Sequence, residues 1–205
     1  MAIIHDAQLS PTKPELIEKW LPRQPWFRAA EGPLEVLGAY RFDDPYGEVG
    51  IETHFVRGAD GTVYQVPLTY RGAPMRDAGR YLVTEMQHSV LGDRWVYDAA
   101  ADPVYVAALA AAIFTGGREA DGFADGADEP LPNPVRVRGT GTMARAPQAT
   151  LVDLSTDDGI TTIRTDSAAI RLRRVLDGTT DDRLRLDLLE GVDGAPATLA
   201  VVVAG

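Results

Sequence analysis

Residues with the chemistry of metal ligands are few in this sequence, and their spacing does not bring them together. The three histidines, His5, His54 and His88, stand in separate contexts without the H-E-x-x-H spacing typical of a metal site. We interpret each as a core or surface side chain. There is no cysteine, which excludes disulfides and thiolate ligands. The sequence therefore predicts no metal and no cofactor.

Adjacent aspartates form three pairs, each in a segment typical of turns. Acid–base catalysis by two carboxylates needs environments that separate their pKa values, and solvated turns do not provide them. A serine nucleophile of the G-x-S-x-G type is also absent from the sequence. We therefore predict no catalytic role for the pairs Asp43-Asp44, Asp157-Asp158 and Asp181-Asp182.

A glycine-rich segment, GTGTMA at residues 139–144, has the spacing G-x-G-x-x-A after a predicted strand. Glycines in such a loop can let backbone amides approach a phosphate group. Pro147, which follows closely, argues against the helix that a dinucleotide fold requires, and no Walker A sequence is present. A β-turn or bulge is the preferred interpretation, and a partial phosphate cradle is the alternative.

Aromatic side chains offer flat faces on which a carbohydrate could stack. Core packing is the commoner use of tryptophan and tyrosine, and both possibilities stay open. The predicted ligand-binding candidates of this type are Trp26, Tyr64, Tyr70 and Trp95.

The composition is that of an ordinary soluble globular protein. Of the 205 residues, 45% are hydrophobic and 24% are charged, and the net charge is −10. A negative field repels phosphate backbones, so we expect no nucleic-acid partner. The first apolar run is too short for a signal peptide, and no stretch approaches the ~18 apolar residues of a membrane span. We expect a cytoplasmic protein without membrane association.

The first half of the sequence predicts two helices with a meander of strands between them, and these elements would position the candidate residues. Thr12 and Glu15 have capping-box spacing, and Pro22 ends the helix that follows. A second helix is predicted from its N-cap Asp102 to the glycines at 116–117. Between the helices, hydrophobic runs separated by turn residues predict antiparallel strands at 34–42, 49–56, 62–70, 81–86 and 95–97.

The second half is predicted to be mainly β. Residues 118–134 contain five acidic residues, one basic residue and little to bury, which is typical of a linker. We therefore predict an α+β protein with a first domain at 1–117, an acidic linker at 118–134 and a mainly antiparallel β-rich region at 135–205. The strands of that last region are predicted at 135–139, 150–154, 161–165, 168–176, 184–189 and 198–203.

Three segments have the order and separation of motifs from one protein family. They are WLPRQPWF at 20–27, YQVPLTYR at 64–71 and GDRWVYDA at 92–99, the last followed by Asp102-Pro103. They resemble the W-L-P-x-Q-R-W-F, Y-Q-x-P-L-x-Y and V-Y-D-A-x-x-D-P segments of the N-terminal cap of actinobacterial maltokinases. The resemblance covers about residues 16–114. It implies a small α+β cap with a curved antiparallel sheet packed on helices.

A looser resemblance links residues 165–176 to the strand that carries the nucleotide-binding lysine in the intermediate subdomain of these kinases. Arg171 is the nearest counterpart of that lysine, and it completes the candidate ligand-binding set. The family's catalytic aspartate stands in an H-G-D-x-H-x-x-N motif of a helical lobe, and no His-Gly-Asp occurs in residues 1–205. Phosphoryl transfer needs a positioned base and metal ligands, so we expect a protein that is not an enzyme.

The resemblance implies a non-catalytic cap-like protein, a binding or regulatory module in glucan, maltose or trehalose metabolism. A carbohydrate ligand or a protein partner would contact the cap sheet. Three alternatives stay open. They are a sugar-kinase-related component completed by a partner, an enzyme of unrecognised type, and a structural role as a homo-oligomer.

Overall fold

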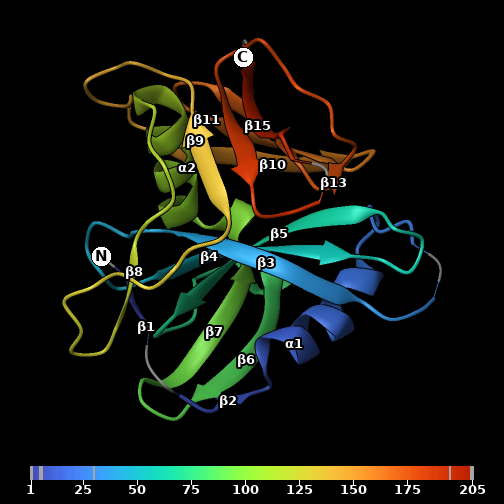
Figure 1. Ribbon diagram of the computed structural model, residues 1–205, viewed down its shortest axis with the longest axis vertical. Helices are drawn as coiled ribbons and strands as arrows, with labels where there is room; N and C mark the ends of the chain where they lie inside the picture. The colour runs from blue at the N-terminus through green and yellow to red at the C-terminus, as the bar shows by residue number, and fades with distance from the viewer. Residues whose placement is uncertain (1, 5–6, 30, 194, 204–205) are drawn as a thin grey trace.

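Two antiparallel sheets form most of the protein (Figure 1). The computed structural model describes residues 2–4, 7–29, 31–193 and 195–203. The larger sheet has the order β2 (Leu9–Ser10), β6 (Leu82–His88), β7 (Gly92–Asp98), β5 (Val63–Arg71), β4 (Gly50–Arg57) and β3 (Glu35–Phe42), with β13 (Val175–Leu176) paired to β5. The smaller sheet has the order β10 (Leu151–Asp157), β11 (Ile160–Thr165), β12 (Ala169–Arg173), β15 (Ala197–Val203), β14 (Arg185–Glu190) and β9 (Arg136–Gly139). A short parallel pair joins β1 (Ala2–Ile4) to β8 (Gly122–Ala124).

The described residues contain two α-helices beside the sheets, and both helices carry the predicted caps. In α1 (Lys13–Trp20), the Thr12 hydroxyl accepts the Glu15 amide while the Glu15 carboxylate accepts the Thr12 amide. In α2 (Pro103–Thr115), the Asp102 carboxylate accepts the Val104 amide at 2.9 Å. Three short 3-10 helices cover Leu21–Arg23 (η1), Gly79–Tyr81 (η2) and Ala99–Ala101 (η3). The predicted α+β fold class and the antiparallel pairing of the strands are confirmed.

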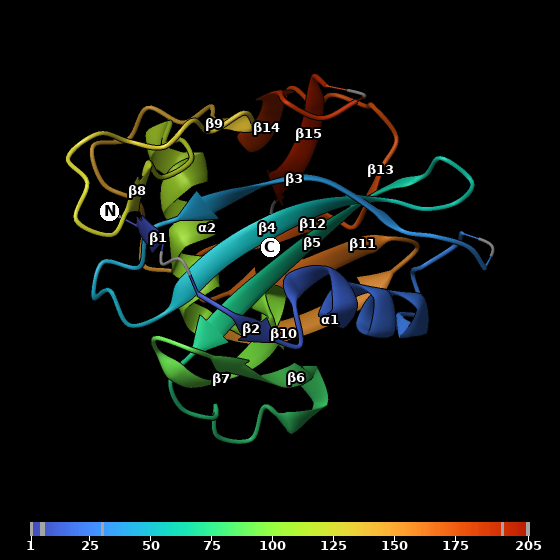
Figure 2. The same ribbon diagram turned by 60° about the horizontal axis from the view of Figure 1, so that its bottom comes forward.

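The larger sheet separates two hydrophobic cores, because side chains alternate between its faces. One face packs on α1 through residues such as Val56 and Val66. The opposite face packs on α2 and the smaller sheet through residues such as Tyr40 and Phe55. Figures 1 and 2 both show β3, β4 and β5 running between the two helices. No helix in the described part of the chain is long and apolar enough to cross a bilayer.

The two halves of the sequence share the second of these cores. A single strand is predicted at 168–176, but Arg174 divides it into β12 and β13. The division lets β12 stay in the smaller sheet while β13 adds to the larger one. The Gln65 side chain also donates to the Arg173 carbonyl at 2.7 Å and to the Leu199 carbonyl at 3.1 Å. Backbone pairing and side-chain bonds therefore join the sheets.

Residues 118–134, predicted as a linker, contain β8 and one buried acidic side chain. Glu119 accepts the Val137 amide at 2.9 Å and forms an ion pair with Arg136 at 2.6 Å. The Glu119 carboxylate therefore binds the segment to β9. The acidic composition that predicted a solvated linker includes this one buried acid. The division into domains at 117 and 135 stays a prediction.

Candidate functional site

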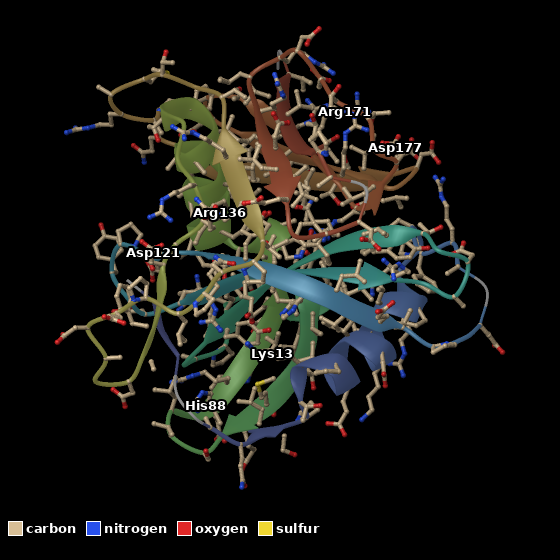
Figure 3. The ribbon with its side chains drawn as sticks, in the orientation of Figure 1. Lys13, His88, Asp121, Arg136, Arg171 and Asp177 are labelled. Carbon is tan, nitrogen blue, oxygen red and sulfur yellow. The ribbon has the colours of Figure 1, made fainter. Side chains whose placement is uncertain are left out.

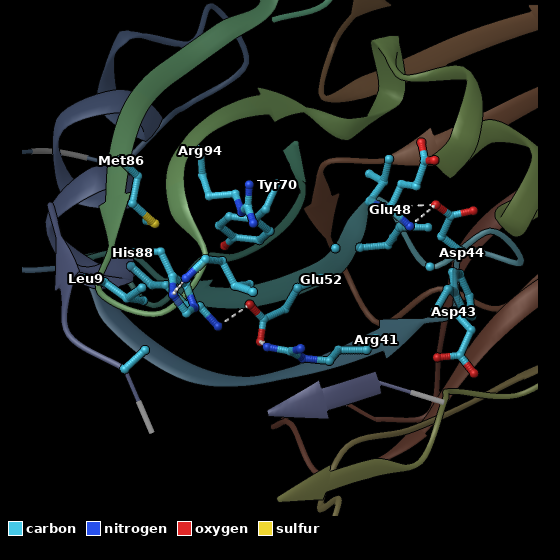
Figure 4. Close-up of a pocket in the computed structure, with 18 residues that line it drawn as sticks. Leu9, Arg41, Asp43, Asp44, Glu48, Glu52, Tyr70, Met86, His88 and Arg94 are labelled. Carbon is cyan, nitrogen blue, oxygen red and sulfur yellow. Dashed lines mark hydrogen bonds and ion pairs between the residues drawn. The ribbon is translucent and has the colours of Figure 1, made fainter. Parts of the chain in front are cut away.

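The face of the larger sheet that carries α1 is only partly covered. Helix α1 has eight residues, so it is about 12 Å long. Strands β4 and β5 have eight and nine residues and extend over roughly 27–30 Å. The uncovered end of this face holds a pocket of about 470 Å³ (Figure 4). We name it the sheet pocket. Its lining comes from β2, α1, the strands β3, β4 and β5, the β3–β4 loop and the β6–β7 hairpin. The lining includes Lys13, Arg41, Asp43, Asp44, Glu48, Glu52, Tyr70, Met86, His88 and Arg94.

A charged cluster centred on Glu52 forms part of the lining. Glu52 is only 8% exposed. Its Oε2 lies 2.5 Å from Lys13 Nζ and 3.3 Å from His54 Nε2. Its Oε1 lies 3.2 Å from Arg41 Nη2. A buried carboxylate is costly unless it is paired, and these neighbours provide the pairing.

The pKa of Glu52 reflects this balance. Burial alone would raise it, but the adjacent His54, Arg41 and Lys13 outweigh burial and hold the pKa well below its usual value. Glu52 is therefore a carboxylate throughout the neutral range.

Tyr70 lies beside this cluster. Burial raises the pKa of Tyr70 well above its usual value, and the Glu52 charge adds to the effect. Its hydroxyl lies 3.3 Å from His54 Nε2, and Lys13 Nζ lies 5.6 Å from the centre of its ring. The neutral phenol thus joins the hydrogen-bonding groups of the sheet pocket.

The β3–β4 loop forms the acidic end of the sheet pocket. Asp44 fixes this loop by accepting the amides of Tyr46, Glu48 and Val49 at 2.9–3.0 Å. Figure 4 places Asp43, Asp44 and Glu48 at one end, well separated from Arg94 and His88 on the β6–β7 hairpin.

The predicted ligand-binding residues do not converge. Only Tyr70 lines the sheet pocket. Trp26 and Tyr64 are 5% and 0% exposed in the core beneath α1. The Tyr64 hydroxyl accepts the amides of Arg28 and Ala29, so it serves as an anchor for the chain. Their burial leaves these two rings no open face on which a sugar could stack.

Trp95 and Arg171 lie away from the sheet pocket as well. Trp95 follows Arg94 on β7, so its side chain points to the opposite face of the larger sheet. Arg171 lies on β12 of the smaller sheet, and Figure 3 shows it far from Lys13. A role for any of these four residues in binding stays a prediction.

The glycine segment at 139–144 packs on the end of α2. The amide of Gly141 donates to the Ile113 carbonyl at 2.9 Å, and the amide of Met143 donates to the Phe114 carbonyl at 3.0 Å. A Cβ on Gly139 would lie 1.8 Å from the Ala112 carbonyl oxygen. The glycines therefore allow close backbone approach, and the amides of Gly141 and Met143 face the negative end of a helix. This geometry contradicts the phosphate-cradle alternative.

Sequence analysis missed Glu52, Lys13, Arg41 and Arg94. The segment GIETHFVR of β4 held one signal, because Glu52 and His54 share a face of a strand whose other residues are largely apolar. Nothing in the sequence placed α1 or β7 against that face. Among the described residues, no three acidic or histidine side chains are grouped as metal ligands, and His5 lies outside those residues.

One part of the chain matches a known protein family. Residues 20–102 match the model of the maltokinase N-terminal cap domain. All three cap motifs lie inside the matched range, so the predicted resemblance is confirmed there. No curated protein matches the chain.

Proposed function

We propose that this chain, whose residues 20–102 match the maltokinase N-terminal cap domain, is a non-catalytic module that binds a carbohydrate in the sheet pocket. The match supports a role in glucan, maltose or trehalose metabolism. The observation that supports this proposal most strongly is the sheet pocket itself. It lies on the sheet that contains most of the matched residues, and it combines charged groups of both signs with one tyrosine.

The chemistry of the lining suits a polyhydroxylated ligand. A sugar presents many hydroxyl groups, each of which can donate and accept a hydrogen bond. Asp43 and Glu48 offer acceptors, and Arg41 and Arg94 offer donors. Met86 and the Tyr70 ring add apolar surface. A volume of about 470 Å³ lies in the usual range for small-molecule pockets.

The split-kinase alternative gains no support from the second half. It would use the amides near Gly141 and the Arg171 side chain as a nucleotide cradle. Those amides already donate to carbonyls of α2. The alternative to carbohydrate binding is that a protein partner binds to the cap sheet.

Thermal stabilisation of the purified chain tests the proposal. We would compare glucose, maltose, maltodextrin, trehalose and Mg-ATP, and assay each mixture for phosphorylated sugar. A ligand at 100 times its dissociation constant stabilises the folded state by about 2.7 kcal/mol, which shifts the melting temperature by several degrees. A shift with a saccharide and no turnover is expected. Phosphorylation of any sugar, or no shift with any saccharide, would contradict the proposal.

A further inference from the structure

We infer that the ligand of the sheet pocket carries an anionic group, held at the β6–β7 end by Arg94 and Lys13. The inference rests on the proposed function and specifies the class of carbohydrate, which is a sugar acid or a sugar phosphate. The inference follows from the balance between positive and negative side chains at each end of the pocket.

Among the described residues that line this end of the sheet pocket, cations outnumber acids. Lys13 and Arg41 both pair with Glu52, so two permanent positive charges share one carboxylate. Arg94 adds a third. Its Nη1 donates to the Asp93 carbonyl at 3.1 Å, and it has no carboxylate partner among the described residues. An excess of partly enclosed cations over carboxylates favours an anion as a ligand group.

Two of these cations, Arg94 and Lys13, lie beside Tyr70. Tyr70 of β5 pairs with Val96 of β7, and Arg94 lies two residues from Val96 on the same face. Arg94 is therefore a diagonal neighbour of Tyr70, and Figure 4 shows them beside each other. Lys13 Nζ lies 5.6 Å from the centre of the same ring. An anionic group above the Tyr70 hydroxyl would be within reach of both cations.

The opposite end of the sheet pocket fixes the orientation. Asp43, Asp44 and Glu48 line that end, and a second anion there would be repelled. The Asp43 and Glu48 carboxylates suit the hydroxyl groups of the sugar ring instead. One ligand with an anionic end and a hydroxylated end satisfies both halves of the pocket.

Titration calorimetry at neutral pH and low salt tests the inference. We would titrate glucose, glucuronate, glucose 6-phosphate and inorganic phosphate into the wild-type chain. We expect at least one of the two anionic sugars to bind about tenfold more tightly than glucose, since charge-assisted hydrogen bonds are roughly twice as strong as neutral ones. Comparing the carboxylate with the phosphate identifies which anion the site prefers.

Two variants locate the effect. Arg94→Gln should abolish the preference for the anionic sugar over glucose, and Arg94→Lys should restore part of that preference. Arg145→Gln is the matched control, because Arg145 is exposed outside the sheet pocket and loses the same charge. The melting temperature of each variant checks its folding.

The outcomes separate the two proposals. Equal binding of glucose and its anionic derivatives overturns the inference and leaves the proposed function standing. Tight binding of inorganic phosphate without binding of any sugar supports the anion site and contradicts carbohydrate binding. Absence of binding by all four compounds overturns both.

Discussion

Arg174 and Asp98 form a buried ion pair in which one guanidinium nitrogen lies 2.8 Å from both carboxylate oxygens. Arg174 is 1% exposed. Its Nε donates to the Thr161 hydroxyl at 2.8 Å, and its guanidinium carbon lies 5.2 Å from the centre of the Trp26 ring. Asp98 belongs to the part that matches the cap domain, and Arg174 to the part beyond it. The pair therefore connects the cap to the smaller sheet.

Removal of Asp98 should strongly destabilise the fold. Asp98→Ala leaves the buried Arg174 charge without its partner, and loss of one partner of a buried pair costs about 3–5 kcal/mol. Urea denaturation would measure the free energy of unfolding. Asp121→Ala is the control, because its ion pair with Arg118 is exposed and should matter little. Equal stability of the two variants would show that the buried pair does not hold the sheets together.

The close approach of Gly141 to α2 gives a second prediction. A Cβ on Gly141 would lie 2.1 Å from the Phe114 carbonyl oxygen, so Gly141→Ala must displace the segment from the helix. We expect a loss of about 1–3 kcal/mol in unfolding free energy, as for other overpacked sites. Gly79→Ala meets nothing within 4 Å and serves as the control. If Gly141→Ala is as stable as the control, the segment does not pack as described.

The low pKa of Glu52 gives a prediction about pH. A carboxyl group with a lowered pKa in the folded state stabilises the protein above its unfolded pKa, and this contribution is lost as pH falls through the lower, folded value. Glu52→Gln should therefore cost about 1–3 kcal/mol at neutral pH by leaving its cationic partners unsatisfied. The difference from the wild type should shrink as pH falls below the ordinary pKa of 4.5 toward the lower, folded value, because the unfolded wild-type chain then takes up a proton that the folded chain does not.

Melting temperatures of both chains from pH 3 to 7 measure this effect. Glu129→Gln, which changes an exposed carboxylate, should follow the wild type at every pH. A difference between wild type and Glu52→Gln that widens toward acid pH would have the wrong sign and would contradict the assignment.

The sequence predicted the helices and most strands because their signals are local. The Thr12 capping box, the Asp102 N-cap and the turn glycines act within a few residues of themselves. The two-residue β2 and the parallel pair of β1 and β8 have no such local pattern. The break at Arg174 was also invisible, because its cause is a partner 76 residues away.

The site could be predicted only in part, for the same reason. Tyr70 was a candidate by residue type, and the structure places it in the sheet pocket. Lys13, Arg41 and Glu52 come from three different elements, so no spacing in the chain signals their cluster. Trp26 was a candidate by the same rule as Tyr70, but burial against Tyr64 makes it a core residue.

Titration of a maltodextrin into Tyr70→Leu and Trp95→Leu variants tests carbohydrate binding in the sheet pocket most directly. Both variants remove an aromatic side chain from the larger sheet, but only Tyr70 lines the pocket. The account predicts that Tyr70→Leu weakens binding at least tenfold, about 1.4 kcal/mol, while Trp95→Leu binds as the wild type does. Binding that survives Tyr70→Leu and is lost in Trp95→Leu would place the ligand on the other face of the sheet and contradict the account.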